Sequence, residues 1–423
     1  MRLSCAILPT SKRFTIVSMA TASSTRPQLA HLTAQLDDLR QRGTFFKLRV
    51  LDGEQGPVCT YDGKQVINLA SNNYLGLTAD PRLREAAIQA TKDYGVGSGA
   101  VRTIAGTMKI HMELEEKIAR FKNVEACVVF QSGFTANAGT VSSILGKEDF
   151  IISDELNHAS IIDGARLSRA KIKVFRHKDV AHAEEQLKEI QNEPGRKLII
   201  TDGVFSMDGD IGPVDKLCDL AEKYGAIMMV DDAHASGVLG RNGRGSIDHF
   251  NCHGRVDIQV GTLSKAIGAL GGYVCGSKDL IDFLYHRARP FLFSTSHPPS
   301  VTATCIAAFD ILEQEPERID RLWDNTRYFK AELGKMGFDI GGNNTPASET
   351  PITPIIVGEG RRTMEFSRAL FDNGLMATGI AFPTVAEGKA RIRTIMTSEH
   401  TRPQIDQALG ILEKTAKKLG ILA

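Results

Sequence analysis

A lysine and an aspartate that each follow a short apolar run are the strongest chemical signal in the sequence. The run 227–230 ends in Asp231, His234 follows shortly after, and the run 258–260 leads to Lys265. A lysine in a glycine-flanked loop, where partial burial can depress its pKa, can form an imine with an aldehyde. A carboxylate buried at a strand end can keep a pyridine nitrogen protonated, so that a pyridoxal ring becomes an electron sink. The two residues therefore predict a site for a pyridoxal cofactor.

Polar groups that follow other apolar runs extend this prediction. Gly133 and Phe134 lie where a predicted strand turns into a helix, so their backbone N–H groups could bind the cofactor phosphate. Ser206 and His234 could hydrogen-bond the ring oxygen, and His158 could stack on the ring. Ligands of open α/β sheets bind at the carboxyl ends of the strands. We therefore expect these residues to gather at one edge of a sheet.

Simpler interpretations of the single residues stay open. Lys265 could be a surface lysine, and Asp231-Asp232 could be a helix cap. The glycine-rich stretch 95–102 lacks the ending of a phosphate-binding loop. Cys252-His253, near His249, has no second ligand pair at finger-like spacing, so no metal site is expected. The joint occurrence of the polar groups after separate strands is what favours a cofactor site.

The elements that must position these residues can be predicted from seven short apolar runs that alternate with helix-like segments. The runs are 127–130, 150–152, 172–175, 198–200, 227–230, 258–260 and 273–275. Continuous apolar runs are typical of strands buried on both faces, and their alternation with helices implies right-handed crossovers. We therefore predict an α/β fold with a mainly parallel seven-stranded sheet in a large domain and a smaller C-terminal α+β domain.

The chain of 423 residues is longer than one hydrophobic core usually carries. We predict four parts: an extension that is disordered or a targeting signal (1–36), an N-terminal segment (37–75), a large cofactor-binding domain (76–310) and a small domain (311–423). Periodicity further predicts helices at 29–39, 81–94, 299–312, 321–333, 363–374 and 403–419, a hairpin at 58–69, and strands at 351–357 and 390–396.

Charge and cysteine content limit the classes of partner and compartment. Lys plus Arg number 51 and Asp plus Glu number 50, so no net field favours nucleic acid or a membrane surface. No apolar run approaches the roughly 20 residues of a membrane helix. The seven cysteines are dispersed without a paired pattern, which suits a reducing compartment, and we expect the cytoplasm. Residues 1–36 lack Asp and Glu, so a transit peptide to the mitochondrial matrix stays open beside a start at Met19.

Four motifs in order resemble those of the α-oxoamine synthases. They are residues 71–76 (SNNYLG), 156–160 (LNHAS), 231–234 (DDAH) and 262–265 (TLSK). The resemblance runs from about residue 30 to the C-terminus. It implies a fold-type I enzyme dependent on pyridoxal 5'-phosphate (PLP) that joins an amino acid to an acyl-CoA, as a homodimer with shared active sites.

Three further motifs suggest the substrates. Residues 201–209, 391–394 and 399–401 are most similar to those of the family members that condense glycine with acetyl-CoA to 2-amino-3-oxobutanoate, the glycine C-acetyltransferases of threonine and glycine metabolism. That reaction is the expectation. The alternatives are 8-amino-7-oxononanoate synthesis from alanine and a pimeloyl thioester for biotin, a broad-specificity α-oxoamine synthase, and a PLP aminotransferase or lyase.

The resemblance also implies roles for single residues. Lys265 would bind the cofactor aldehyde and later remove the substrate α-proton, and Asp231 would pair with the pyridinium nitrogen. His234 and Ser206 would contact the ring hydroxyl, and His158 the ring face. The phosphate would be held by Gly133, Phe134 and Thr262, with Ser294 and Thr295 reaching in from a second subunit. The substrate carboxylate would bind Arg393, with Asn72 and His158 beside it.

Overall fold

The computed structural model describes residues 27–422, which divide into two compact units on either side of Phe46. In the first unit, the turn η1 (Pro27–Leu29) leads into helix α1 (Ala30–Gln41). This helix confirms the predicted N-terminal helix and carries an ion pair of 2.6 Å between Arg40 and Asp37. The predicted extension 1–36 falls mostly on residues 1–26, which lie outside the described residues.

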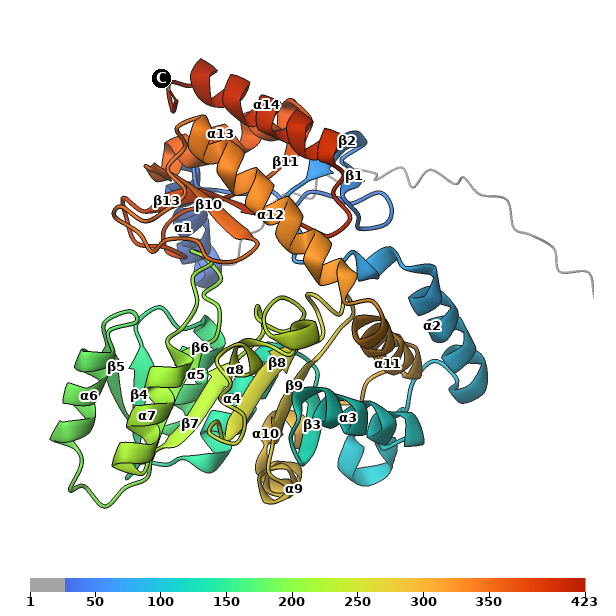
Figure 1. Cartoon of the computed structure of the whole chain (residues 1–423), viewed down its shortest axis with the longest axis vertical. Helices are drawn as coiled ribbons and strands as arrows, with labels where there is room; N and C mark the ends of the chain where they lie inside the picture. Colours follow the sequence, from blue (N-terminus) through green and yellow to red (C-terminus); the bar gives the residue numbers. More distant parts are fainter. Residues whose placement is uncertain (1–26, 423) are drawn as a thin grey trace, which may run out of the picture. The chain divides into compact units, whose positions relative to one another are not determined.

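The second unit is built on a seven-stranded sheet (Figure 1). Its strands are β3 (Ala126–Phe130), β4 (Phe150–Asp154), β5 (Lys171–Phe175), β6 (Lys197–Asp202), β7 (Ile227–Asp231), β8 (Ile258–Thr262) and β9 (Gly272–Gly276). Their order is β3-β9-β8-β7-β6-β4-β5, and only β9 runs antiparallel to its neighbours. The seven predicted runs and the mainly parallel sheet are confirmed.

Helices cover both faces of this sheet, which explains why its strands are continuously apolar. One face packs against α4 (Gly133–Ile144), α5 (Ala159–Ser168), α9 (Lys278–Arg287) and α10 (Arg289–Leu292). The other packs against α6 (Val180–Glu189), α7 (Val214–Tyr224) and α8 (Ser246–His249), and near β3 and β9 against α3 (Lys109–Lys122). Successive residues alternate between the faces, so Ile199 and Ile200 of β6 enter different cores.

A smaller sheet lies in the C-terminal part of the second unit, drawn in orange and red in Figure 1. It has the order β10-β13-β12, with β10 (Ile352–Gly358), β13 (Ala390–Ile395) and β12 (Thr378–Ile380) antiparallel. Around it are α12 (Glu317–Lys335), α13 (Gly360–Asp372) and α14 (Arg402–Lys418). The strands and helices predicted for the small α+β part are therefore present.

A third sheet joins segments far apart in the chain. The predicted hairpin forms β1 (Val58–Tyr61) and β2 (Lys64–Asn68), and β11 (Leu375–Met376) pairs with β2 in parallel. Helices α2 (Pro81–Tyr94) and α11 (Pro299–Gln314) lie side by side, with the short η2 (Leu77–Ala79) and η3 (Arg102–Gly106) near them in sequence. Of the described residues, 47–422 form one compact unit, and the finer domain boundaries stay a prediction.

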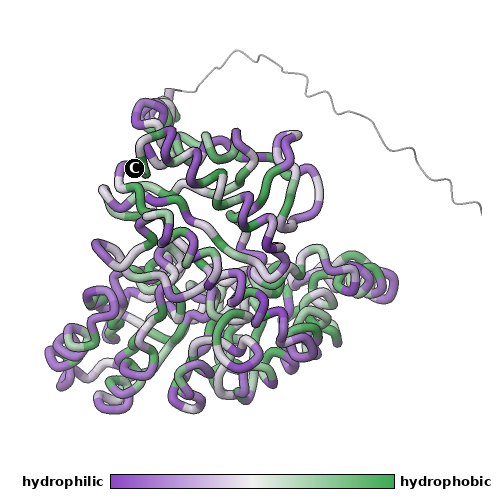
Figure 2. Tube along the Cα trace, turned by 45° about the horizontal axis from the view of Figure 1, so that its top comes forward, coloured by the Kyte–Doolittle hydropathy of each residue, from purple (hydrophilic) through white to green (hydrophobic). Residues whose placement is uncertain are grey.

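Hydrophobic segments run through the strands of the sheets, and hydrophilic ones lie on the outer turns of the helices (Figure 2). Between Pro27 and Leu422, no helix is long and apolar enough to cross a membrane.

Candidate active site

Two aspartates lie side by side at the carboxyl edge of the large sheet. Asp231 ends β7, and its register partner on β6 is Asp202; both are buried. Asp231 accepts hydrogen bonds from the Ala233 N–H at 2.8 Å and from Asn137 Nδ2 at 2.5 Å. Burial and the charge of Asp231 raise the pKa of Asp202 well above its usual range. The edge therefore holds one carboxylate fixed by two donors and a second carboxyl group that favours its neutral form.

Lys265 lies beside these carboxyl groups, in the loop between β8 and β9, and is partly buried. Burial lowers the pKa of its amine to about 8, and the nearby charge of Arg393 acts in the same direction. The charge of Asp231 opposes that shift, and Asp202 does so when it is ionised. An amine with this pKa is neutral in an appreciable fraction of molecules near pH 7, which is the form that attacks a carbonyl carbon.

His234 is buried beside Tyr74, which comes from the loop after β2. The Tyr74 hydroxyl and His234 Nδ1 are 2.8 Å apart, and the two rings meet edge to face. Burial, then the charges of Lys265 and Arg393, lower the pKa of His234 well below its usual range. The imidazole is therefore neutral, and within residues 27–422 its Nε2 makes no hydrogen bond, so it can bond a ligand while Tyr74 holds Nδ1.

His158 stands at the start of α5 with its side chain exposed. Its Nδ1 is 2.7 Å from Ser160 Oγ, and its backbone N–H donates to Asp202 at 2.8 Å. Enough protein surrounds the ring that desolvation lowers its pKa; the charge of Lys265 acts the same way, and that of Asp231 opposes it. An open, neutral ring next to buried ionisable groups suits stacking on a flat ligand.

The N-terminus of α4 forms the anion-binding part of the site. Ser132 caps this helix by accepting from the Thr135 N–H at 3.1 Å, which leaves the N–H groups of Gly133 and Phe134 without a partner among the described residues. A Cβ on Gly133 would lie 3.5 Å from Thr262 Cβ, so Thr262 borders the same place. Free N–H groups at a helix N-terminus favour a phosphate.

Arg393 of β13 brings the small sheet to the site. Its Nε donates to the Ser206 carbonyl at 2.6 Å, and both Nη atoms lie 3.3 Å from Asn72 Oδ1. Burial lowers the pKa of this guanidinium. Within residues 27–422, no carboxylate oxygen lies within ion-pair distance of Arg393. The two Nη atoms can therefore donate hydrogen bonds to the carboxylate of a ligand.

The structure therefore gathers ten of the predicted residues at one edge of the large sheet. They are Asn72, Gly133, Phe134, His158, Ser206, Asp231, His234, Thr262, Lys265 and Arg393. Ser206 takes part through its carbonyl. For the remaining two, Ser294 and Thr295, residues 27–422 show no hydrogen bond to these ten; Thr295 pairs with Val101, and its carbonyl accepts from Gln131 at 2.8 Å. Their contribution to a second subunit stays a prediction, as do the roles of the ten.

Three polar residues of the site had no predicted role. Asn137 is the one amide in α4, Tyr74 follows the asparagines of the SNNYLG motif, and Asp202 ends β6. A signal for each was present, because an amide in a small-residue helix and an acid at a strand end both need partners when buried. Their partners could not be read from sequence spacing.

These features match the chemical groups of PLP. Unpaired N–H groups at α4 suit its phosphate, the buried Asp231 carboxylate suits a pyridinium, and the Lys265 amine suits an aldehyde. The exposed His158 ring suits its aromatic face. The donor set of the site therefore fits the cofactor that the sequence predicts.

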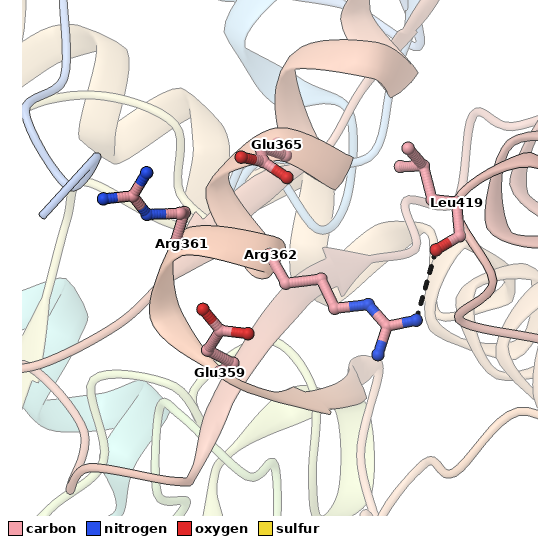
Figure 3. A pocket seen from close by; sticks show the side chains of 5 residues that line it. All are labelled: Glu359, Arg361, Arg362, Glu365 and Leu419. Carbon is pink, nitrogen blue, oxygen red and sulfur yellow. Dashed lines mark hydrogen bonds between the residues drawn. The ribbon is translucent and has the colours of Figure 1, made fainter.

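A separate hollow lies between α13 and the end of α14. Its lining residues are Glu359, Arg361, Arg362, Glu365 and Leu419, and Figure 3 shows Arg362 reaching the Leu419 carbonyl, to which it donates at 3.1 Å. No residue predicted for chemistry lines this hollow.

Comparisons with known proteins agree with the predicted cofactor chemistry. The family described as aminotransferase class I and II matches residues 64–412. The chain is 58% identical to 8-amino-7-oxononanoate synthase of Symbiobacterium thermophilum and 57% identical to 8-amino-7-oxononanoate synthase 1 of Bacillus subtilis, in each case over 92% of this chain and 98% of the relative.

Solved structures give the same fold. A variant of serine palmitoyltransferase from S. paucimobilis, with a PLP–myriocin aldimine bound, superposes with a TM-score of 0.88 at 31% identity, over 93% of this chain and 99% of that one. An 8-amino-7-oxononanoate synthase from Francisella tularensis superposes with a TM-score of 0.69 at 30% identity, over 84% and 98%. These relatives are PLP-dependent enzymes, and the predicted cofactor is confirmed.

The prediction of glycine and acetyl-CoA as substrates is wrong, and with it the C-acetyltransferase reaction and the link to threonine catabolism. Curated relatives at 53–58% identity over nearly the whole chain are 8-amino-7-oxononanoate synthases. The motifs behind the prediction build the frame of the site: Arg391 pairs with Asp208, and His400 Nε2 lies 3.2 Å from the Asn68 carbonyl. Both contacts join parts of the protein to one another.

Proposed function

Because the chain belongs to the aminotransferase class I and II family, as an α-oxoamine synthase of fold type I, we propose that it joins alanine to a pimeloyl thioester to make 8-amino-7-oxononanoate. The new bond links the alanine α-carbon to the pimeloyl carbonyl carbon, the thiol leaves, and the alanine carboxylate departs as carbon dioxide. The main support is the 58% identity to an 8-amino-7-oxononanoate synthase over 98% of its length.

Bound PLP supplies a conjugated ring that accepts the electron pair left at the α-carbon. For this work we assign the ring nitrogen to Asp231, whose carboxylate is held in place by two hydrogen-bond donors. His234 is assigned to the ring hydroxyl and His158 to the ring face. The N–H groups of Gly133 and Phe134, with Thr262, are assigned to the phosphate.

Lys265 is assigned as the base that removes the α-proton. A pKa of about 8 lets its amine take a proton and give it back near neutral pH. Arg393 would hold the alanine carboxylate with its two Nη atoms, which at present share the single Asn72 oxygen. Fixing the carboxylate sets which bond at the α-carbon faces Lys265.

We further propose that the enzyme is a homodimer in which Ser294 and Thr295 complete the phosphate site of the partner subunit. Support comes from the neighbouring Phe293, whose side chain is 70% exposed in a single chain. Mixing chains that carry Lys265→Ala with chains that carry Thr295→Ala tests this, since only a mixed dimer contains one site free of both changes. Absence of recovered activity in the mixture contradicts a shared site.

A paired assay tests the reaction itself. Purified enzyme is given alanine with pimeloyl-CoA, or glycine with acetyl-CoA, and thiol release and products are measured. We expect thiol release and 8-amino-7-oxononanoate from the first pair, and neither from Lys265→Ala. Faster turnover of the second pair, or amino-group transfer without thiol release, refutes the proposal.

A further inference from the structure

Two arginines of β13 hold the same loop of the large sheet. Arg391 and Arg393 are separated by one residue on a strand, so their side chains leave the same face. Both donate hydrogen bonds to the segment Ser206–Met207–Asp208, which follows β6. The segment is thus the place where the small sheet meets the carboxyl edge of the large one.

Arg391 binds other parts of the protein through two of its three guanidinium nitrogens. Its Nη1 lies 2.5 Å from Asp208 Oδ1 and 3.1 Å from the Met207 carbonyl, and its Nε donates to the Lys389 carbonyl at 2.9 Å. Arg391 and Asp208 are 3% and 4% exposed. Burial raises the pKa of Asp208 even beside this arginine, because desolvation outweighs the attraction of the Arg391 charge. A buried ion pair of this kind is weak evidence for a role in stability alone.

Arg393 makes one short hydrogen bond and two long ones within the protein. Its Nε is held by the Ser206 carbonyl at 2.6 Å, while its two Nη atoms face one neutral oxygen at 3.3 Å each. The anchor of the guanidinium is therefore the main chain of the segment that Arg391 and Asp208 fix. If Ser206 moves, the direction of the Arg393 fork moves with it.

We propose that Arg391 and Asp208 are positioning residues for the amino-acid substrate: they hold the 206–208 segment so that the Ser206 carbonyl aims Arg393 at the substrate carboxylate. This inference rests on the proposed role of Arg393 as the carboxylate-binding residue. It goes beyond that role because it places part of the specificity for amino acids in an ion pair that touches no substrate atom.

If the Arg391–Asp208 pair only stabilised the fold, its loss would have a different effect on ligand binding than the loss of a positioning pair. Loss of a purely stabilising pair would lower the stability of the protein, and the affinities of all amines at the site would stay unchanged or fall by the same factor. A positioning pair affects ligands that carry a carboxylate and spares those without one. Alanine and ethylamine differ by that carboxylate, so their binding separates the two roles.

The experiment uses the PLP-loaded enzyme and follows the absorption of the bound cofactor while alanine or ethylamine is added. For Asp208→Asn we expect the Kd of alanine to rise about 10-fold, the scale of one lost charge-assisted contact, and the Kd of ethylamine to change less than about 2-fold. The KM for alanine should rise in parallel, with a smaller change in kcat. Arg391→Lys, which keeps the charge, should recover part of the alanine affinity relative to Arg391→Met.

Asp149→Asn is the matched control. Asp149 is also a buried aspartate paired with an arginine, Arg196 at 2.9 Å, but it precedes β4 at the opposite edge of the same sheet. Its replacement should leave the ratio of alanine to ethylamine affinity unchanged. Urea unfolding of both variants shows whether their losses of stability are comparable.

Two results overturn the inference. One is an equal loss of alanine and ethylamine affinity in Asp208→Asn. The other is a full effect of Asp208→Asn on alanine when Arg393 has already been replaced by Met, because positioning through Arg393 requires the two changes to be non-additive. Failure of the proposed function is seen separately: Arg393→Met alone would then leave alanine binding intact, whatever Asp208→Asn does.

Discussion

Tyr74 and His234 share a hydrogen bond of 2.8 Å between Oη and Nδ1, although one lies in the loop after β2 and the other follows β7. The bond fixes the ring of His234 and decides which of its nitrogens remains for another partner. It also ties the N-terminal hairpin region to the edge of the large sheet.

Replacing Tyr74 with Phe should therefore weaken the protein and disturb the ring of His234. A buried nitrogen left without its partner costs about 1–3 kcal/mol, so we expect the free energy of unfolding to fall by that amount. Urea unfolding measures it, with Tyr94→Phe in α2, an exposed tyrosine, as the control. An unchanged midpoint in Tyr74→Phe contradicts the prediction.

The reactivity of Lys265 should follow its lowered pKa. Only the neutral amine attacks an aldehyde, so in cofactor-free protein the rate at Lys265 should rise with pH and level off above about 8. The rate at an ordinary lysine would keep rising until about pH 10.4, the usual pKa of its amine. Borohydride trapping of an added aldehyde, followed by peptide mass spectrometry, gives the rate at this residue.

The variant Asp231→Asn tests whether Asp231 affects the pKa of Lys265. The carboxylate of Asp231 raises the pKa of the Lys265 amine, so its removal should move the plateau to lower pH. A plateau that stays in place, or moves to higher pH, would show that the two groups do not interact as the structure indicates.

Asn137 should support cofactor binding through Asp231. Its Nδ2 donates to Asp231 at 2.5 Å and to Ser160 Oγ at 3.0 Å, and a hydrogen bond to a charged group contributes about 1.5–3 kcal/mol. Asn137→Ala should raise the Kd for PLP by roughly 10- to 100-fold in a titration of cofactor-free protein. Ser143→Ala is the control in the same helix, since the Ser143 hydroxyl donates to the Gly139 carbonyl and to no other group in the described part of the chain. Equal affinities in the two variants count against the assignment.

His177 should make stability depend on pH. Its ring lies between Asp154 and Asp210, with Nδ1 at 2.9 Å and Nε2 at 2.8 Å. Burial alone would lower the pKa of His177, but the two carboxylates raise it to about 9. The folded state therefore keeps a proton that the unfolded chain releases near pH 6.5, and this contribution is complete below 6.5 and lost as pH rises through 9.

His177→Gln should thus lower the free energy of unfolding by roughly 3 kcal/mol at pH 6, and the difference from the original protein should shrink between pH 6.5 and 9. Urea unfolding at a series of pH values measures it. A difference that is constant over this range, or that grows with pH, is incompatible with a charged His177.

The secondary structure could be predicted because its signals are local. Each strand of the large sheet is a short apolar run, and a strand buried on both faces needs nothing else. The direction of β9 is different, since an apolar run has no direction, and so its antiparallel pairing with β3 and β8 could not be predicted. The two-residue strand β11 is too short to leave a pattern.

The site was predictable only in part for a similar reason. Lys265 and Asp231 are marked by type and by the strands before them, whereas the partner of Asp231 is an amide on α4 that only the fold brings near. The substrates were missed because the motifs used to choose them, such as the Arg391–Asp208 pair, hold elements together. Side-chain contacts between residues that are far apart in the chain cannot be predicted from the spacing of neighbouring residues.

The origin of Arg393 in the last strand of the small sheet has a consequence for how the protein is made. The large sheet is complete once Gly276 has been added, but the ribosome must then extend the chain to β13, which at about 5–20 residues per second takes on the order of ten seconds. During that interval the growing chain already has Asp231, Lys265 and the other groups that its own subunit is proposed to offer the cofactor, and it lacks Arg393, which is proposed to bind the substrate carboxylate. Vitamin B6 could thus reach the nascent protein before any substrate can, and would favour its folding by binding only the folded form.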